Sequence, residues 1–171
     1  MSWVKPPRGW VKVNTDGSAS NPPGRAGAGG LLRDEEGDWI GGFSLNVGSA
    51  NSLSAELFGI REGLNLAWEK GFRKVVIESD SEAAISLVKM GDVKSHPLGG
   101  LIQDCKVLIG RFWDCQISHT FREGNTSADF LAGLGSAQSE RCIYWVNPPQ
   151  ELCPIVFADM VGTSFLRVVA A

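Results

Sequence analysis

The chain has 171 residues, of which 43% are hydrophobic and 20% charged, and this balance excludes disordered, collagen-like and coiled-coil proteins. The formal net charge of -3, from 16 basic and 19 acidic residues, does not indicate a strongly basic nucleic-acid binder. The length suits one domain with some additional chain.

Features of membrane and secreted proteins are missing from the sequence. No apolar run approaches the roughly 18 residues of a membrane span, and the start lacks the apolar core of a secretory signal. The four cysteines contain no C-x-x-C pair, which favours reduced thiols over a zinc site. We therefore expect an intracellular monomer, in the nucleus or the cytoplasm, without membrane association.

Strand patterns come first along the chain. Residues 10–16 alternate apolar and polar side chains, which is the period of a strand. Two further strands are predicted at 27–33 and 39–44, and turn-forming residues at 21–24 and 34–38 separate the three. This order indicates an antiparallel meander.

A helix follows, because apolar residues recur at helical spacing from Leu53 to Ala67. Ser52 or Ser54 can cap its start. Gly59 and Gly63 lie on the apolar face, where they cost helix stability and make sense only if that face approaches another backbone closely. We expect Glu56, one position off that face, at the boundary between helix and sheet.

The second half of the chain predicts two strands and three helices. The strands are at 74–80 and 116–121, and the helices at 81–88, 98–112 and 126–134. A strand that leads directly into a helix indicates a parallel crossover. The fold class is therefore α/β, with a five-stranded mixed sheet in the order β-β-β-α-β-α-α-β-α and helices on both faces.

The sequence beyond residue 140 is predicted to be irregular, because prolines stand at 148, 149 and 154. We expect a domain at 8–140 and a C-terminal tail at 141–171. The tail would either wrap the domain or link it to something absent from this chain.

Four carboxylates stand at the edges of predicted elements: Asp16, Glu56, Asp80 and Asp129. If these four carboxylates come together, their charges repel one another, and the group needs cations. Ligation by oxygen alone selects hard ions such as Mg²⁺ or Mn²⁺. Two such ions suit phosphodiester hydrolysis, in which one activates a water and the other stabilises the leaving oxygen. No protein nucleophile is apparent.

Five motifs resemble type 1 ribonuclease H, and most closely its plant domains related to retroelement reverse transcriptases. The motifs occur in family order at 14–18, 27–30, 55–57, 78–81 and 125–132. The resemblance implies a ribonuclease H-like fold and endonucleolytic cleavage of the RNA strand of an RNA–DNA hybrid.

The resemblance also implies roles for individual residues. Asp16, Glu56, Asp80 and Asp129 match the acids that bind two Mg²⁺ ions, for which Mn²⁺ may substitute. His119 or Arg122 would assist turnover. The residues expected to contact the substrate are Gly17, Ser18, Asn21, Ser52, Ser81, Arg122 and Asn125.

Three departures from the family pattern keep other functions open. Ser52 stands where many members have Asn, Glu82 stands where Gln is common, and residues 89–111 lack a basic protrusion. Weak, salt-sensitive binding to the hybrid is expected. A catalytically inactive nucleic-acid-binding module derived from a retroelement is the alternative, and an interaction domain that uses the tail is the third hypothesis.

Overall fold

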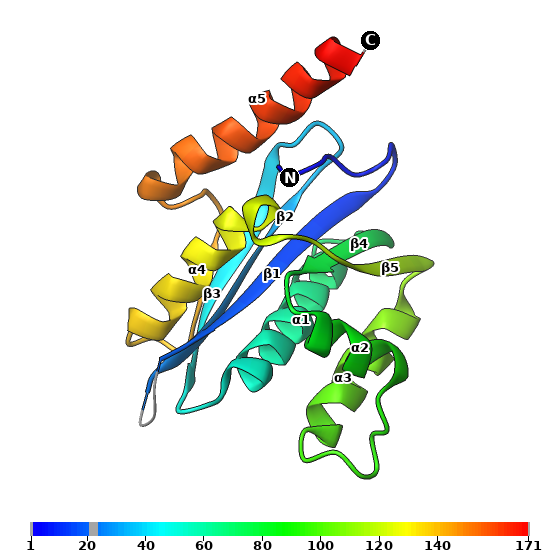
Figure 1. Ribbon diagram of the computed structural model, residues 1–171, viewed down its shortest axis with the longest axis vertical. Coiled ribbons are helices and arrows are strands. Elements are labelled where there is room, and N and C mark those ends of the chain that lie inside the picture. The colour runs from blue at the N-terminus through cyan, green and yellow to red at the C-terminus, as the bar shows by residue number, and fades with distance from the viewer. Residues whose placement is uncertain (1, 21–23, 171) are drawn as a thin grey trace.

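The computed structural model describes residues 2–20 and 24–170, the last eight of these by their backbone alone. A mixed sheet of six strands forms its centre, in the spatial order β5-β4-β1-β2-β3-β6 (Figure 1). The strands are β1 Val11–Ala19, β2 Ala26–Arg33, β3 Trp39–Gly48, β4 Lys74–Ser79, β5 Asp114–His119 and β6 Cys142–Trp145.

The predicted meander and the predicted parallel crossover are both present. β1, β2 and β3 pair antiparallel, whereas β4 pairs in parallel with both β1 and β5. This arrangement places β1 at the middle of the sheet, where an antiparallel neighbour and a parallel neighbour meet.

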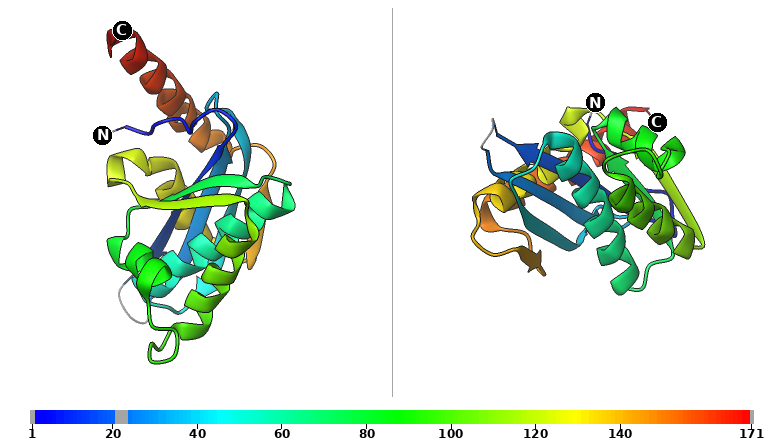
Figure 2. Two further views of the ribbon diagram at one scale, coloured as in Figure 1. Left: turned by 90° about the vertical axis from the view of Figure 1, so that its right-hand side faces the viewer. Right: turned by 90° about the horizontal axis from the view of Figure 1, so that it is seen from below.

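Helices cover both faces of the sheet, as the sequence predicted. α1 packs on β1 and β2 and is joined on its outer side by α2 and α3, while α4 lies across the opposite face (Figures 1 and 2). The helices are α1 Ser52–Glu69, α2 Glu82–Met90, α3 Gly99–Arg111, α4 Thr126–Ala137 and α5 Cys153–Ala170, with short 3₁₀ helices at Arg122–Gly124 and Gln150–Leu152. Among the described residues, no helix combines the length and apolarity of a membrane span.

Two hydrophobic clusters lie on the two faces of the sheet. The larger contains the inner side of α1, including Leu57, Ile60 and Leu64, together with Cys105 of α3. The smaller joins Leu31 of β2 and Leu131 of α4 to residues of the C-terminal segment. Cys105 is completely buried there.

The prediction of five strands and an irregular tail is wrong. β6 pairs antiparallel with β3, with Phe43 opposite Tyr144, and so adds a sixth strand at the edge. α5 begins at Cys153, which puts Pro154 in the first turn, where a missing N–H breaks no helical hydrogen bond. Leu152 and Val156 are buried in the smaller cluster, so this segment forms part of the core.

Candidate active site

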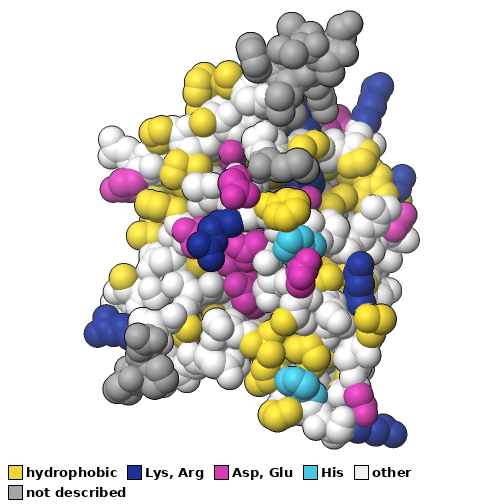
Figure 3. Space-filling model, viewed as in Figure 1, with side chains coloured by type: hydrophobic (Ala, Val, Ile, Leu, Met, Phe, Trp, Pro, Cys, Tyr) yellow, Lys and Arg dark blue, Asp and Glu magenta, His cyan; other side chains and the backbone are white. Residues whose placement is uncertain are grey.

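Three carboxylates from separate elements converge at the middle of the sheet. Asp16 of β1, Glu56 of α1 and Asp80 after β4 each offer an oxygen, and these oxygens lie within 4.8 Å of one another. Figure 3 shows acidic side chains gathered near the middle of the face that Figure 1 presents. The last β1–β4 pair is Thr15 opposite Ser79, so the next residues of the two parallel strands, Asp16 and Asp80, emerge side by side.

Glycines bring α1 close enough for Glu56 to join Asp16. A Cβ atom on Gly17 would stand 2.4 Å from the backbone nitrogen of Glu56, and one on Gly59 would stand 3.0 Å from the carbonyl oxygen of Asp16. Only residues without a side chain allow this contact between helix and strand. The predicted close approach and the boundary position of Glu56, which is 8% exposed, are confirmed.

Hydrogen bonds hold the buried carboxylates in place. The Gly17 backbone N–H donates to Asp16 Oδ1 at 2.9 Å, and the Ser79 hydroxyl donates to Glu56 Oε2 at 3.4 Å. The Ser79 hydroxyl in turn accepts from the backbone N–H of Ser81 at 3.1 Å. The chain that follows β4 therefore helps to orient the acid on α1.

Burial and mutual repulsion raise the pKa values of the two innermost acids. Desolvation is the largest cause for Asp16, followed by the charge of Glu56 and a hydrogen bond with it. Desolvation also raises the pKa of Glu56, and the charge of Asp80 adds to it, against hydrogen bonds from Asp16, Gly17 and Ser79. Without a cation, this cluster retains a proton that an isolated carboxylate would lose.

Asp129 stands at the margin of the group. It lies in the first turn of α4 and is exposed, and it is not one of the three acids with oxygens within 4.8 Å. Its side chain is still near enough to Asp16 to be one of the smaller causes that raise the pKa of Asp16. The structure therefore brings all four predicted acids to one place, three of them closely.

The predicted substrate residues lie in different environments. Ser18 and Ser81 are partly buried, and Ser81 caps α2 by accepting from the Ala84 N–H at 3.2 Å. Ser52 is exposed in the first turn of α1, whose N-cap is Asn51 in place of the predicted Ser52 or Ser54. Arg122 is exposed, and Asn21 lies outside the described residues.

Asn125 does not face the solvent, in contrast to the predicted substrate contact. Its side chain is 1% exposed, accepts from Asn14 Nδ2 at 3.2 Å and donates to the Thr15 carbonyl at 2.9 Å. Both ends of the amide group are thus used within the protein. A buried amide needs hydrogen-bond partners at both ends. Asn125 finds both partners in β1, and it therefore connects the start of α4 to that strand.

His119 closes β5 opposite Ser79, next to the strand end that leads to Asp80. Its Nδ1 lies 4.0 Å from Glu82 Oε1. Its ring forms a T-shaped contact with the ring of Phe121, with the two centroids 5.4 Å apart. The predicted strand position of His119 is confirmed. Its role in turnover stays a prediction.

Sequence reasoning missed a buried polar network beside the acids. Asn14 is completely buried two residues before Asp16, and it contacts Trp3, Arg33, Glu78 and Asn125. The alternation of Lys12, Asn14 and Asp16 placed these polar side chains on one side of β1. It gave no sign that α4 and both terminal segments cover that side.

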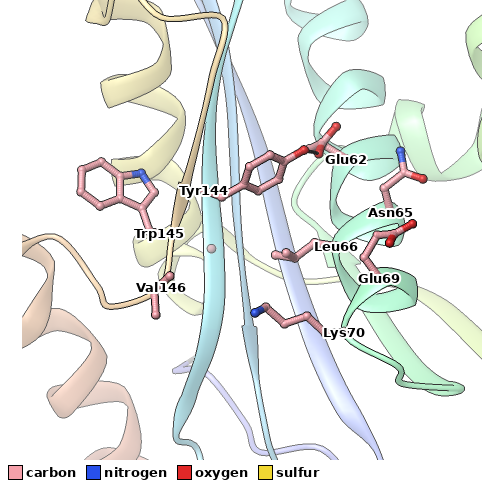
Figure 4. Close-up of a pocket in the computed structure, with 9 residues that line it drawn as sticks. Glu62, Asn65, Leu66, Glu69, Lys70, Tyr144, Trp145 and Val146 are labelled. Carbon is pink, nitrogen blue, oxygen red and sulfur yellow. Dashed lines mark hydrogen bonds between the residues drawn. The ribbon is translucent and has the colours of Figure 1, made fainter.

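A separate cavity of about 410 Å³ lies between the second half of α1 and the strands β3 and β6 (Figure 4). Tyr144 donates a hydrogen bond to Glu62 across it, and Lys70 extends over its lower part (Figure 4). Helix α1 contributes to both places, but none of Asp16, Glu56 and Asp80 lines this cavity. This cavity is therefore distinct from the carboxylate group.

Residues 14–135 match the family described as reverse transcriptase-like. The chain belongs to this family. It is also 48% identical, over 164 residues, to an Arabidopsis thaliana protein named "Putative ribonuclease H protein At1g65750". The match covers 96% of the chain but only 26% of that relative, so the chain spans about a quarter of the relative's length.

Solved ribonuclease H structures share the fold of this reverse transcriptase-like domain. RNase H1 from Halobacterium salinarum is 25% identical, with a TM-score of 0.69, and covers 74% of the chain and 96% of its own. The N-terminal RNase H domain of Rv2228c from Mycobacterium tuberculosis is 25% identical, with a TM-score of 0.70. This match covers 75% of the present chain and 94% of the Rv2228c chain. LC11-RNase H1, solved with an RNA/DNA hybrid, is 22% identical, with a TM-score of 0.67. This match covers 74% of the present chain and 96% of the LC11-RNase H1 chain. The ribonuclease H-like fold predicted from the sequence is confirmed.

Proposed function

We propose that this domain is a metal-dependent nuclease that hydrolyses the RNA strand of RNA–DNA hybrids. The convergence of Asp16, Glu56 and Asp80, with oxygens within 4.8 Å of one another, is the observation that carries the proposal. The ribonuclease H name of the Arabidopsis relative and the RNA/DNA hybrid in the LC11-RNase H1 structure support this choice of substrate.

The donor set fits hard divalent cations. All its ligand atoms are carboxylate oxygens, which Mg²⁺ and Mn²⁺ prefer, and no soft thiolate or imidazole belongs to the group. Asp16, Glu56 and Asp80 would hold such ions, and Asp129 would complete the set from α4. When bound, a pair of these ions supplies an activated water and stabilises the leaving oxygen of the scissile phosphodiester.

The protein itself holds these acids in place and presents the side chains around them to the substrate. Gly17 and Ser79 fix the two buried carboxylates by the hydrogen bonds described above. His119 is partly exposed beside the end of β4, and we assign it the role of assisting turnover. The exposed Arg122 lies in the segment before α4, from which its guanidinium can reach a phosphate oxygen.

A catalytically inactive nucleic-acid-binding module is the second candidate. Glu82 favours it, because this side chain is 83% exposed beside His119 and places a negative charge where phosphates would pass. The marginal place of Asp129 points in the same direction.

A cleavage assay separates the two candidates. End-labelled RNA–DNA hybrid is incubated with the protein and Mg²⁺ or Mn²⁺, and the RNA fragments are resolved on a denaturing gel. We expect cleavage that Asp80→Asn abolishes and that Asp104→Asn, an exposed acid on α3, leaves unchanged. Intact RNA with either ion, together with hybrid binding that a chelator does not alter, would instead establish the binding module.

A further inference from the structure

The polar network around Asn14 uses every hydrogen-bonding position of that side chain. Asn14 Oδ1 accepts from Trp3 Nε1 and from Arg33 Nη2, each at 2.9 Å. Its Nδ2 donates to Glu78 Oε1 at 3.0 Å and to Asn125 Oδ1 at 3.2 Å. An asparagine amide offers two donors and two acceptor sites, so this buried side chain has one orientation only.

Arg33 connects this network to the C-terminal helix. Its side chain is 1% exposed, stacks on the Trp3 ring at 3.9 Å from the centroid, and donates from Nη1 to Asp159 Oδ2 at 2.7 Å. A buried guanidinium requires such a partner, because an unpaired charge in the interior is costly. The N-terminal segment and α5 lie at the same end of the molecule (Figure 1), held there in part by these contacts.

The same network reaches the first turn of α4, which carries Asp129. Asp159 Oδ2 also accepts from the Ser127 hydroxyl at 3.5 Å. On the other side, Asn125 contacts Asn14 and the Thr15 carbonyl, and its own carbonyl accepts from the Asp129 N–H at 3.0 Å. The turn is therefore held both by β1 and by α5.

We propose that Arg33 and Asp159 are positioning residues for Asp129. They fix the first turn of α4 against β1 through Asn14, Asn125 and Ser127, and so set how closely the Asp129 carboxylate approaches Asp16. Asp159 lies beyond residue 135, where the family match ends, so this contact to α4 comes from outside the matched residues. The consequence for cleavage rests on the function proposed above, whereas the geometric role does not.

The test compares Asp159→Asn with Asp104→Asn in the full chain. Both substitutions remove one carboxylate from an ion pair with arginine, but Asp104 pairs with Arg61 on the exposed side of α1 and α3. Three properties are measured: hydrogen exchange of the backbone amides 126–130 in chelator, Mn²⁺ binding by calorimetry, and kcat and KM for hybrid cleavage. Asp159→Glu tests rescue by a retained charge.

We expect Asp159→Asn to raise exchange at residues 126–130 about tenfold. Mn²⁺ affinity and kcat should fall about 10- to 100-fold, which is the usual effect of removing a residue that orients a metal ligand. KM should stay unchanged, Asp104→Asn should match the wild type, and Asp159→Glu should recover most of the loss. Wild-type exchange and Mn²⁺ affinity in folded Asp159→Asn would overturn the proposal.

A second variant covers the case in which Asp159→Asn does not fold. Arg33→Met combined with Asp159→Leu replaces the buried pair by apolar side chains, a change that commonly preserves stability, while it removes the bond to Asn14. Normal exchange at residues 126–130 in this double variant would reject the positioning role. If the wild type neither binds Mn²⁺ nor cleaves hybrid, the proposed function fails, and the exchange rates alone decide the positioning role.

Discussion

The backbone nitrogen of Glu56 lies 2.4 Å from the point where a Cβ atom of Gly17 would stand. The contact that seats α1 on β1 is therefore the same contact that brings Glu56 beside Asp16. Packing and site geometry cannot change independently here, because the atoms on both sides of the contact belong to the backbone.

Gly17→Ala should separate α1 from β1 and disrupt the carboxylate group. We expect the free energy of unfolding to fall by about 3 kcal/mol, the upper part of the range for overpacking, because a backbone cannot rotate away. Mn²⁺ binding should be lost. Urea unfolding and calorimetry measure the two effects.

Gly133→Ala in α4 is the matched control for this substitution. Nothing lies within 4 Å of the Cβ position at Gly133. The alanine should raise stability by about 1 kcal/mol through helix propensity alone. Undiminished Mn²⁺ binding by Gly17→Ala would contradict the role assigned to the close approach.

Asp16→Asn should stabilise the protein in the absence of divalent ions. The neutral amide removes a buried acid whose pKa is raised by desolvation and by Glu56, while an oxygen remains to accept from the Gly17 N–H. We expect a gain of about 1 to 2 kcal/mol in the free energy of unfolding, since each pKa unit corresponds to 1.36 kcal/mol. The rise in Tm on addition of Mg²⁺ should disappear. Asp38→Asn, an exposed acid, should change neither quantity.

The stability of the ion-free protein should decrease as the pH rises. The pKa values of Asp16 and Glu56 are higher in the folded protein than in the unfolded chain, so the folded state binds more protons between the two values. Their contribution is complete below the unfolded value of about 4 and is lost as the pH rises through the folded values.

Thermal unfolding in chelator at about pH 5 and about pH 8 measures this effect, with a lower Tm expected at the higher pH. Saturating Mg²⁺ should reduce the difference, because the ions replace the protons. Asp16→Asn should reduce it as well. A Tm in chelator that rises over this interval, and rises equally in Asp16→Asn, would show that other groups dominate.

Leu152→Ala tests whether the C-terminal segment belongs to the core. Leu152 is fully buried in the smaller cluster, so its truncation should lower the free energy of unfolding by about 2 to 5 kcal/mol. Phe157→Ala, at a position that is 63% exposed on α5, should stay within about 0.5 kcal/mol of the wild type. Equal, small effects of the two substitutions in urea unfolding would mean that the segment unfolds separately.

The positions of the acids could be predicted because local patterns locate them. The alternating residues of β1 end near Asp16, the apolar run of β4 ends before Asp80, and glycines mark the face of α1 beside Glu56. Each of these signals lies within a few residues of the acid. The parallel pairing of β1 with β4 then follows from the crossover between them.

The C-terminal segment could not be predicted in the same way. Its prolines indicate a break in regular structure unless the exact start of the helix is known, and Pro154 is tolerated only because α5 begins one residue earlier. Arg33 and Asp159 are separated by 126 residues, and neither residue type indicates a buried partner by itself. Tertiary packing, and no local pattern, decides that this pair is buried.

Because β1 pairs in parallel with β4, the carboxylate group cannot form on the ribosome before β4 has been synthesised. Val11 of β1 pairs with Val75 of β4, which is synthesised 64 residues later. The turn that carries Asp129 is held by contacts with Asn125 and Asp159, which follow β4 in the chain. Joining segments this distant is slow compared with forming local helices. A nascent chain that contains only the first two acids therefore lacks the carboxylate group, which assembles only after β4 and Asp80 have been made.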